Sequence, residues 1–287
     1  MTDKVAIITG GSRGIGRATA LAAASRGFRV VVGYASNQKA ADEVAAQIES
    51  KNAKAIAVKC DVGSEADILA LFKAADAFGT LGALVNNAGI VGPTMRVDAM
   101  SAERIQRMMA VNVTGSMLCA REAVKRMSTR HGGKGGVIVN LSSVAAKLGS
   151  PNTYVDYAAS KGAIDSFTVG LGYEVAGEGI RVAGIRPGLI DTEIHASGGE
   201  PDRAHRLAHV VPMKRIGTAD EIANAIVWLM SDEASYVTSA ILDVSGGRYN
   251  GVAYLRYRVR SWPLTISLLS APVPAGMSAR SAPPSSA

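Results

Sequence analysis

The chain has 287 residues, of which 48% are hydrophobic and 31 are glycines, a composition typical of a compact α/β protein that can bury a substantial core. Its net charge of +7 suggests that it could bind nucleic acid. However, four of the 31 basic residues are arginines of residues 249–287, and without them 27 basic residues face 24 acidic ones. The body is therefore nearly balanced, and it lacks aromatic stacking positions matched to a basic groove, so nucleic-acid binding is not expected.

Other simple features of the sequence bear on where in the cell the protein is located. Cys60 and Cys119 are the only cysteines, which predicts no disulfide framework and favours a reducing, cytoplasmic environment. The amino terminus lacks the apolar core of a signal peptide. No apolar run reaches the roughly 18 residues of a membrane span. We therefore expect no membrane association.

Apolar, β-rich runs alternate with helical segments along the chain. Strands are predicted at residues 4–9, 29–35, 53–61, 82–87, 135–142, 179–187 and 240–247. Among the helices predicted between them are residues 14–27, 37–51 and 218–230, the last opening with a capping box formed by Thr218 and Glu221. This alternation predicts βαβ units, and hence an α/β protein whose parallel sheet is covered by helices on both faces.

The composition changes after Arg248, which we take as a domain boundary between residues 1–248 and 249–287. The second segment is basic and holds five of the ten prolines, all from Pro263 onward. Its Ala, Ser and Pro content predicts a disordered tail whose deletion leaves the rest intact. The alternatives are a partner-binding or membrane-surface segment, and a short extra strand formed by "VAYLRYRV".

A glycine-rich loop, "TGGSRGIG", follows the first strand and opens the first helix. Gly10, Gly14 and Gly16 allow a sharp turn and a close approach of the backbone to a ligand, and Ser12 and Ile15 lie between them. The free N–H groups of the helix then suit a pyrophosphate. A tight strand–helix turn is the plain alternative, but the strand–loop–helix context favours a dinucleotide. No Gly-Lys-Ser/Thr follows, so the loop is not a P-loop.

The residues after the second strand bear on the choice of dinucleotide. An NAD site usually has an acid about 20 residues after the loop, to hold the ribose 2′-hydroxyl. Here no acid occurs between Gly16 and Asp42, and Arg13 lies inside the loop. The second strand is followed instead by Ser36, Asn37 and Lys39. These residues suit a 2′-phosphate and favour NADP(H) over NAD(H), although Arg13 could also be an exposed loop arginine.

Six motifs occur in a characteristic order: "TGGSRGIG", "NNAG", Asn112 in "VNV", "NLSS", "YAASK" and "RPG". Together, over residues 4–248, they resemble the short-chain dehydrogenase/reductase family, and within it the NADP-dependent bacterial group of 3-oxoacyl carrier-protein reductases and glucose 1-dehydrogenases. The resemblance implies a single, doubly wound Rossmann domain. It also implies a homotetramer and an active site of Ser, Tyr, Lys and Asn.

The resemblance assigns the central chemistry to Tyr157 and Lys161, which are one helical turn apart. An ammonium one turn away should lower the pKa of the phenol from about 10. Tyr157 would then exchange a proton with the substrate oxygen, and Lys161 would also hold the nicotinamide ribose. An ordinary amphipathic helix pair is the alternative. Tyr154 is out of register with Lys161.

The serine assignment is less direct. The family's catalytic serine is usually thirteen residues before the tyrosine, a position that Val144 occupies here. A loop longer by one residue would restore Ser143, which we predict stabilises charge on the substrate oxygen, and Ser142 remains the alternative. The family uses an asparagine such as Asn112 to hold a water that relays protons to the lysine.

Further family positions are carried over to the cofactor site. Asp61 and Val62 follow the third strand, at the place of an adenine contact. The remaining predicted contacts are Asn87, Ala88 and Gly89 along the nucleotide, and Pro187, Gly188 and Thr192 at the nicotinamide amide. Ala183 departs from the family, which often has a structural asparagine after "RV".

Residues 191–215 are predicted to form a substrate lid. His205 and His209 within this segment have the spacing of metal ligands, but no Glu completes a zincin motif and hydride transfer needs no metal, so no metal site is expected.

The sequence therefore predicts an NADP(H)-dependent oxidoreductase that moves a hydride between the nicotinamide and a secondary alcohol or ketone, either sugar-like or 3-oxoacyl-like. The alternative is a non-catalytic NADP(H) sensor, which would have no need of the Ser, Tyr, Lys and Asn set.

Overall fold

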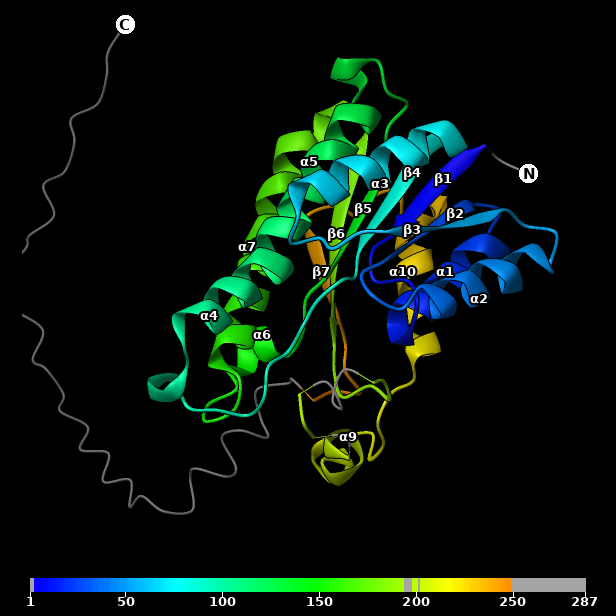
Figure 1. The fold of residues 1–287 in the computed structure, drawn as a ribbon. Helices are drawn as coiled ribbons and strands as arrows, with labels where there is room; N and C mark the ends of the chain where they lie inside the picture. Colours follow the sequence, from blue (N-terminus) through cyan, green and yellow to red (C-terminus); the bar gives the residue numbers. More distant parts are fainter. Residues whose placement is uncertain (1–2, 194–197, 201, 249–287) are drawn as a thin grey trace, which may run out of the picture. The chain divides into compact units, whose positions relative to one another are not determined.

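The computed structural model describes residues 3–193, 198–200 and 202–248. Within them, seven parallel strands form one sheet in the order β3-β2-β1-β4-β5-β6-β7 (Figure 1). The strands are β1 (Lys4–Ile8), β2 (Arg29–Tyr34), β3 (Ala55–Lys59), β4 (Thr80–Asn86), β5 (Gly136–Leu141), β6 (Ile180–Pro187) and β7 (Ala240–Val244). All seven predicted strands are present, and the predicted fold class is confirmed.

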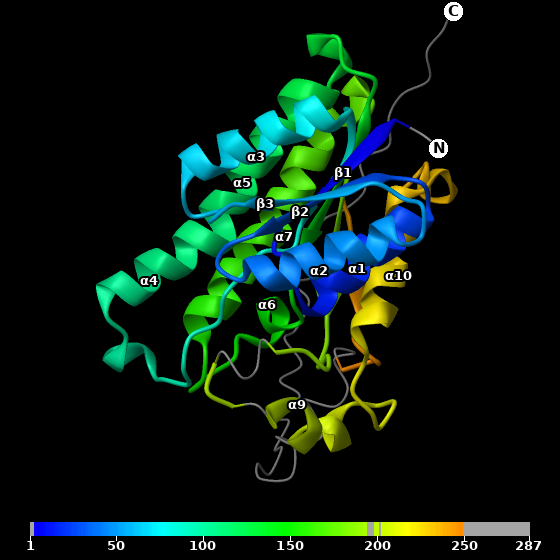
Figure 2. The ribbon, with the colours of Figure 1, turned by 45° about the vertical axis from the view of Figure 1, so that its right-hand side comes forward.

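Helices cover both faces of this sheet (Figures 1 and 2). On one face lie α1 (Gly14–Ser25), α2 (Gln38–Glu49) and α10 (Ala219–Met230), and on the other lie α3 (Glu65–Phe78), α5 (Gly115–Met127) and α7 (Val155–Val175). The described residues also form α4 (Ala102–Met109), α6 (Ala145–Leu148) and α9 (Arg203–Arg206). Short 3₁₀ turns lie at Val97–Ala99, Thr129–His131, Ala176–Glu178, Ala208–Val210 and Asp232–Ala234.

The period-two alternation of each strand divides its side chains between two cores. In β1, Ala6 and Ile8 pack with α1 and α10, whereas Val5 and Ile7 pack with α3 and α5. All four are fully buried. A strand buried on both faces reads as a continuous apolar run, and this explains why "KVAII" is apolar throughout.

Local sequence signals set where the helices begin. The predicted capping box is present: Thr218 accepts from the backbone of Glu221, whose carboxylate accepts in return from the Thr218 N–H. Asn37 caps α2 by accepting from the Ala40 N–H at 3.0 Å. These bonds satisfy N–H groups that a helix cannot satisfy itself.

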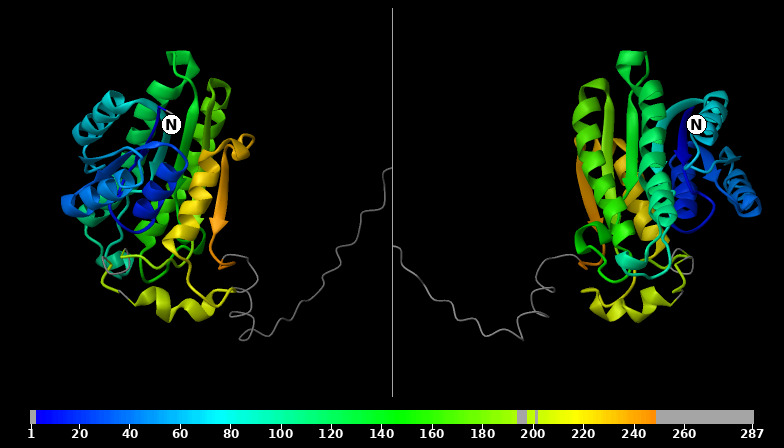
Figure 3. Two further views of the ribbon diagram at one scale, coloured as in Figure 1. Left: turned by 90° about the vertical axis from the view of Figure 1, so that its right-hand side faces the viewer. Right: turned by 60° about the vertical axis from the view of Figure 1, so that its left-hand side comes forward.

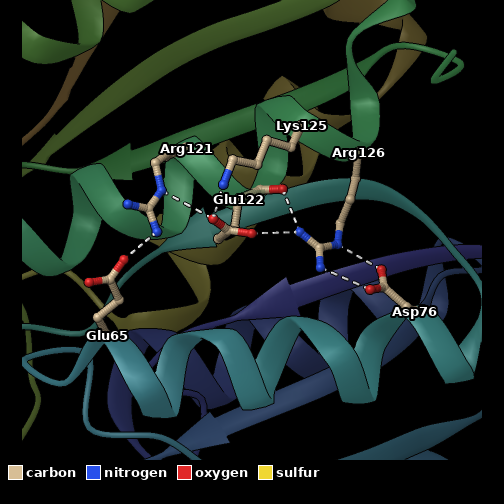
Figure 4. Close-up of polar contacts among 6 residues, drawn as sticks. All are labelled: Glu65, Asp76, Arg121, Glu122, Lys125 and Arg126. Atoms are coloured by element: carbon tan, nitrogen blue, oxygen red, sulfur yellow. Dashed lines mark hydrogen bonds and ion pairs between the residues drawn. The ribbon is translucent and has the colours of Figure 1, made fainter. Parts of the chain in front are cut away.

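An ion-pair network joins α3 to α5 (Figure 4). The carboxylate of Glu122, 5% exposed, accepts from Lys125 and Arg126 on its own helix. Arg126 also forms a two-bonded pair with Asp76 of α3, at 2.7 and 2.9 Å. Burial would raise the pKa of Glu122, but its cationic partners outweigh burial and lower it. The carboxylate therefore stays charged inside the interface.

The fold places the site at the carboxyl ends of the strands, where β1 and β4 are neighbours and the strand order reverses. Ligands of doubly wound sheets bind in the crevice at this point. The segment around α9 lies beyond these strand ends (Figure 3) and packs through a small apolar cluster of Leu189, Ala204 and Val211.

Two predictions concern segments that are described in part or not at all. The lid prediction, residues 191–215, falls partly within the described ranges, and the tail prediction, residues 249–287, lies outside the described residues. Among the helices of the described ranges, none is long and apolar enough to cross a membrane.

Candidate active site

The glycine loop is shaped by its three predicted glycines. Gly10 and Gly14 have φ values of +63° and +50°, which side-chain-bearing residues rarely adopt. A Cβ at Gly16 would lie 2.1 Å from the carbonyl oxygen of Gly10, so only glycine fits there. Arg13 is the N-cap residue of α1 and makes no capping bond with its side chain. The amino end of α1 therefore has the backbone geometry and the free N–H groups that a pyrophosphate requires.

The "NNAG" stretch holds this loop in place. The Asn87 side-chain amide donates to the carbonyl oxygens of Thr9 and Gly10, at 2.8 and 3.0 Å. The Thr9 hydroxyl in turn accepts from the backbone N–H groups of Asn87 and Ala88. The loops after β1 and β4 are thus tied to each other across the crevice.

The predicted cofactor residues line one groove and an adjoining cavity. Those in the groove are Gly10, Ser12, Arg13, Gly14, Ile15, Gly16, Asn37, Asp61, Val62, Asn87, Ala88, Gly89 and Thr192. The cavity is lined by Pro187, Gly188, Ser143, Tyr157 and Lys161, and it shares Ile15, Asn87, Gly89 and Thr192 with the groove. A Cβ at Gly89 would lie 3.6 Å from Nζ of Lys161, so a larger residue there would narrow the junction between them.

Some groove residues differ from the sequence expectation. Lys39 is not among the residues that line this groove, and it lines a separate surface hollow on α2. Arg107, which the motifs gave no reason to select, lines the groove and pairs with Asp61 at 2.8 Å. Burial would raise the pKa of Asp61, but bonds from Gly63 and Arg107 lower it, so Asp61 is a carboxylate. Glu193 is a second acid in the groove.

Tyr157 and Lys161 lie together on α7, as predicted. Nζ of Lys161 is 5.7 Å from the centroid of the Tyr157 ring and donates to the carbonyl oxygen of Leu141 at 2.7 Å. Lys161 is 5% exposed. Both residues line the cavity.

The expected depression of the tyrosine pKa is wrong for this structure. Burial raises the pKa of Tyr157, and a hydrogen bond with Ser143 opposes the rise only in part. The Lys161 ammonium is engaged by the Leu141 carbonyl, and it is not among the groups that shift this pKa. Burial therefore outweighs the interaction with Ser143, and the phenol is neutral at pH 7.

The two serines after β5 have different partners. Ser142 is 4% exposed, and its hydroxyl donates to the carbonyl oxygen of Lys161 at 3.1 Å. The Ser143 hydroxyl accepts from the Ala145 N–H at 3.1 Å, and it is close enough to the Tyr157 hydroxyl to lower the pKa of that phenol. The structure thus brings Ser143, and not Ser142, to the tyrosine, while Val144 is buried.

Asn112 lies in a π-helical turn, Ala110–Thr114, between α4 and α5. Its side chain accepts from the N–H of Ile90 at 2.8 Å and donates to the carbonyl oxygen of the same residue at 3.0 Å. It also donates to the hydroxyl of Ser160 on α7. Single π-helical turns are frequent at functional sites. In this structure, the asparagine joins the loop after β4 to the helix that carries Tyr157 and Lys161.

Asp165 lies one turn beyond Lys161 and influences its charge. Burial lowers the pKa of Lys161 to about 8, and the negative charge of Asp165 acts in the opposite direction. Asp165 itself pairs with Arg186 of the "RPG" stretch at 2.8 Å. Sequence reasoning did not select Asp165, because an acid four residues after a lysine is common on any solvated helix face.

The lid histidines have separate contacts. His205 Nε2 lies 3.6 Å from Asp191, and Nδ1 of His209 lies 3.0 Å from the Arg206 carbonyl oxygen. Among the described residues, no three His, Cys, Asp or Glu side chains are grouped so that they could hold a metal ion.

Comparison with known proteins places residues 10–249 in a family model described as enoyl-(acyl carrier protein) reductase. The chain is 55% identical to the uncharacterized oxidoreductase YgfF of Escherichia coli (strain K12), over 85% of this chain and 99% of that one. It is 41% identical to glucose 1-dehydrogenase 2 of Bacillus subtilis (strain 168), over 86% of this chain and 95% of the relative.

A solved structure shares the arrangement of elements. A short-chain dehydrogenase from Burkholderia cenocepacia J2315, in complex with NADP, superposes with a TM-score of 0.78 at 30% identity, over 86% of this chain and 98% of that one.

Proposed function

The chain belongs to the short-chain dehydrogenase/reductase family of oxidoreductases, and we propose that it reduces a ketone, or oxidises a secondary alcohol, with NADP(H). The observation that carries the proposal is the placement of Tyr157, Ser143 and Lys161 in one cavity, which shares four lining residues with the groove at the amino end of α1. Proton transfer, oxyanion stabilisation and cofactor binding thus share one site.

The residues have separate tasks in this proposal. The bound nicotinamide supplies or accepts the hydride. Ser143 donates a hydrogen bond to the substrate oxygen as negative charge develops there. Tyr157, whose phenol is neutral and therefore carries a proton at pH 7, gives that oxygen its proton. Lys161 helps hold the nicotinamide ribose, and Asn112 holds the loop after β4 against α7.

A carbonyl screen tests the proposal. Purified full-length protein is assayed for NADPH consumption with sugar-derived ketones and lactones, 3-oxoacyl thioesters and simple ketones. We expect turnover with at least one class. Tight NADPH binding without turnover of any of these carbonyl compounds would favour the alternative of a sensor. The intact set of Ser143, Tyr157, Lys161 and Asn112 supports the enzyme.

Arg13 is proposed to select NADP(H). It is exposed at the amino end of α1 and lines the groove together with Ser36 and Asn37. We predict that Arg13→Ala weakens NADPH binding roughly 5- to 150-fold, equivalent to 1–3 kcal/mol, because one charge-assisted contact to the 2′-phosphate is lost. NADH binding should change little. Titration calorimetry with both cofactors measures the difference.

Lys39→Ala is the matched control for this prediction. It removes one positive charge from the same region, but from a surface hollow outside the groove. We expect NADPH affinity within about twofold of wild type. Equal losses of NADPH and NADH affinity in the Arg13 variant would show that Arg13 does not contact the phosphate.

The pKa of Lys161 predicts the pH dependence of reduction. A lysine with a pKa of about 8 carries its positive charge below that pH and loses it above. Tyr157 stays protonated over this range, because burial raises its pKa. We therefore expect kcat/KM for carbonyl reduction to be constant near pH 7 and to fall as the pH rises through about 8.

Asp165→Asn shows whether Lys161 is the titrating group. The negative charge of Asp165 raises the pKa of Lys161, so its removal should move the fall in kcat/KM to lower pH. An unchanged pH profile, or a shift to higher pH, would assign the fall to another group.

Three further parts of the proposal stay predictions. They are a homotetramer, a cytoplasmic location and a lid formed by residues 191–215. In this proposal, the lid and the side chains that line the cavity determine whether the substrate is sugar-like or 3-oxoacyl-like.

A further inference from the structure

A second charged pair lies directly beside the proposed proton donor. Asp156 precedes Tyr157 in the first turn of α7, and its side chain is 4% exposed. Arg104 of α4 donates to both of its carboxylate oxygens, at 2.8 and 3.3 Å. The Arg104 side chain is itself 14% exposed. Two-bonded arginine–carboxylate pairs are directional, so this one fixes orientation as well as distance.

Arg104 also holds the loop that follows β4. Its guanidinium donates to the carbonyl oxygen of Pro93 at 2.7 Å, and a Cβ at Gly92 would lie 2.8 Å from the guanidinium carbon. Arg104 therefore packs flat against a loop residue that has no side chain. In the same loop, the N–H of Met95 donates to the Thr153 carbonyl oxygen just before α7, at 2.9 Å.

Both sets of contacts involve the start of α7, whose first turn carries Tyr157. The loop after β4 contacts it through the bond from Met95 to Thr153, and α4 contacts it through the bond from Arg104 to Asp156. An acidic side chain in the first turn stabilises a helix by its charge near the positive end of the helix dipole. An exposed acid without a partner would already have this effect. The burial of Asp156 against a two-bonded arginine is more than helix stability requires.

We propose that Arg104 and Asp156 are positioning residues that set the location of the Tyr157 hydroxyl relative to Ser143. The inference rests on the proposed role of Tyr157. Neither residue lines the cavity or the groove described above, so each acts through the backbone of α7 and not on substrate. A small displacement of a reacting group is costly, since about 1 Å can reduce a rate by a factor of 100.

The test uses Arg104→Gln, Asp156→Asn and the double variant in the full-length chain. We expect kcat to fall roughly 10- to 100-fold in each single variant. NADPH affinity should stay within about twofold, because the groove is not altered. The double variant should cost no more than either single one, since the two residues act as one unit. Arg104→Lys, which keeps the charge but not the two-bonded geometry, should lie between wild type and Arg104→Gln.

Arg126→Gln is the matched control. Arg126 also forms a two-bonded pair, with Asp76 at 2.7 and 2.9 Å (Figure 4). This pair joins α3 to α5, and neither residue lines the cavity or the groove. We expect this variant to lose thermal stability and to keep its kcat. A fall in kcat of the same size in Arg126→Gln and Arg104→Gln would show that the Arg104 pair is merely structural, and a kcat within twofold of wild type in Arg104→Gln would overturn the proposal.

Hydrogen exchange gives a readout that needs no substrate. Arg104→Gln should speed amide exchange over residues 153–160, whereas Arg126→Gln should do so only in α3 and α5. Unchanged exchange over residues 153–160 in Arg104→Gln would overturn the positioning role even if the enzyme has no known substrate. Retained turnover in Tyr157→Phe would instead contradict the proposed function, so the two failures are distinguishable.

Discussion

Replacing Tyr157 by Phe is expected to reduce turnover at least 1,000-fold, or roughly 4 kcal/mol in activation free energy, while NADPH binds with nearly unchanged affinity. The substitution removes one oxygen from a side chain whose hydroxyl bonds to Ser143. The ring remains to pack near Lys161. Only the proposed proton donor is lost, so a direct comparison of NADPH titration and steady-state rates separates chemistry from binding.

Tyr154→Phe is the comparison variant. Tyr154 is buried at the start of α7 and lines the cavity, but it lies outside the register of Lys161. We expect most turnover to remain, with any effect appearing in KM. The reverse pattern, an active Tyr157 variant and an inactive Tyr154 variant, would show that the wrong tyrosine has been assigned.

Ser143→Ala is expected to lower kcat roughly 100- to 1,000-fold, the cost of removing one donor from a developing oxyanion. Ser143 is half-buried at the cavity and is the serine that bonds to Tyr157. Loss of that bond also removes the one contact that lowers the tyrosine pKa. The pKa of Tyr157 should therefore rise further in the variant.

Ser142→Ala provides the control for this second prediction. The Ser142 hydroxyl donates to the backbone carbonyl of Lys161 and is therefore used within the fold. We expect a loss of stability of about 1 kcal/mol and a change in kcat of less than tenfold. A larger loss of kcat in the Ser142 variant than in the Ser143 variant would reverse the assignment of the two serines.

Much of this fold could be predicted from local patterns. The apolar strand runs, the capping box of Thr218 and Glu221 and the glycine loop all act over a few residues, so the sequence displays them directly. The cofactor residues follow strand ends, and a parallel sheet brings its strand ends to one edge. It was therefore possible to predict that these residues line one groove without knowing how their side chains pack.

The features that could not be predicted depend on burial and on contacts between distant segments. The pKa of Tyr157 is governed by desolvation, which the spacing to Lys161 does not reveal. Arg107 reaches Asp61 from 46 residues away, and Arg104 reaches Asp156 from 52 residues away. Counting thirteen residues back from Tyr157 gives Val144, so the prediction of Ser143 over Ser142 had to assume one more residue in the turn after β5.

The central claim is that this chain transfers a hydride between NADPH and a carbonyl carbon while Tyr157 supplies the proton. The most direct test incubates the enzyme with NADPH deuterated at the transferable position and the most active carbonyl of the screen, followed by mass spectrometry of the product. We predict one deuterium on the carbon that bore the carbonyl oxygen, and no labelled product with Tyr157→Phe. NADPH consumption that leaves no deuterium on that carbon, or equal labelling by the Tyr157 variant, would contradict the account.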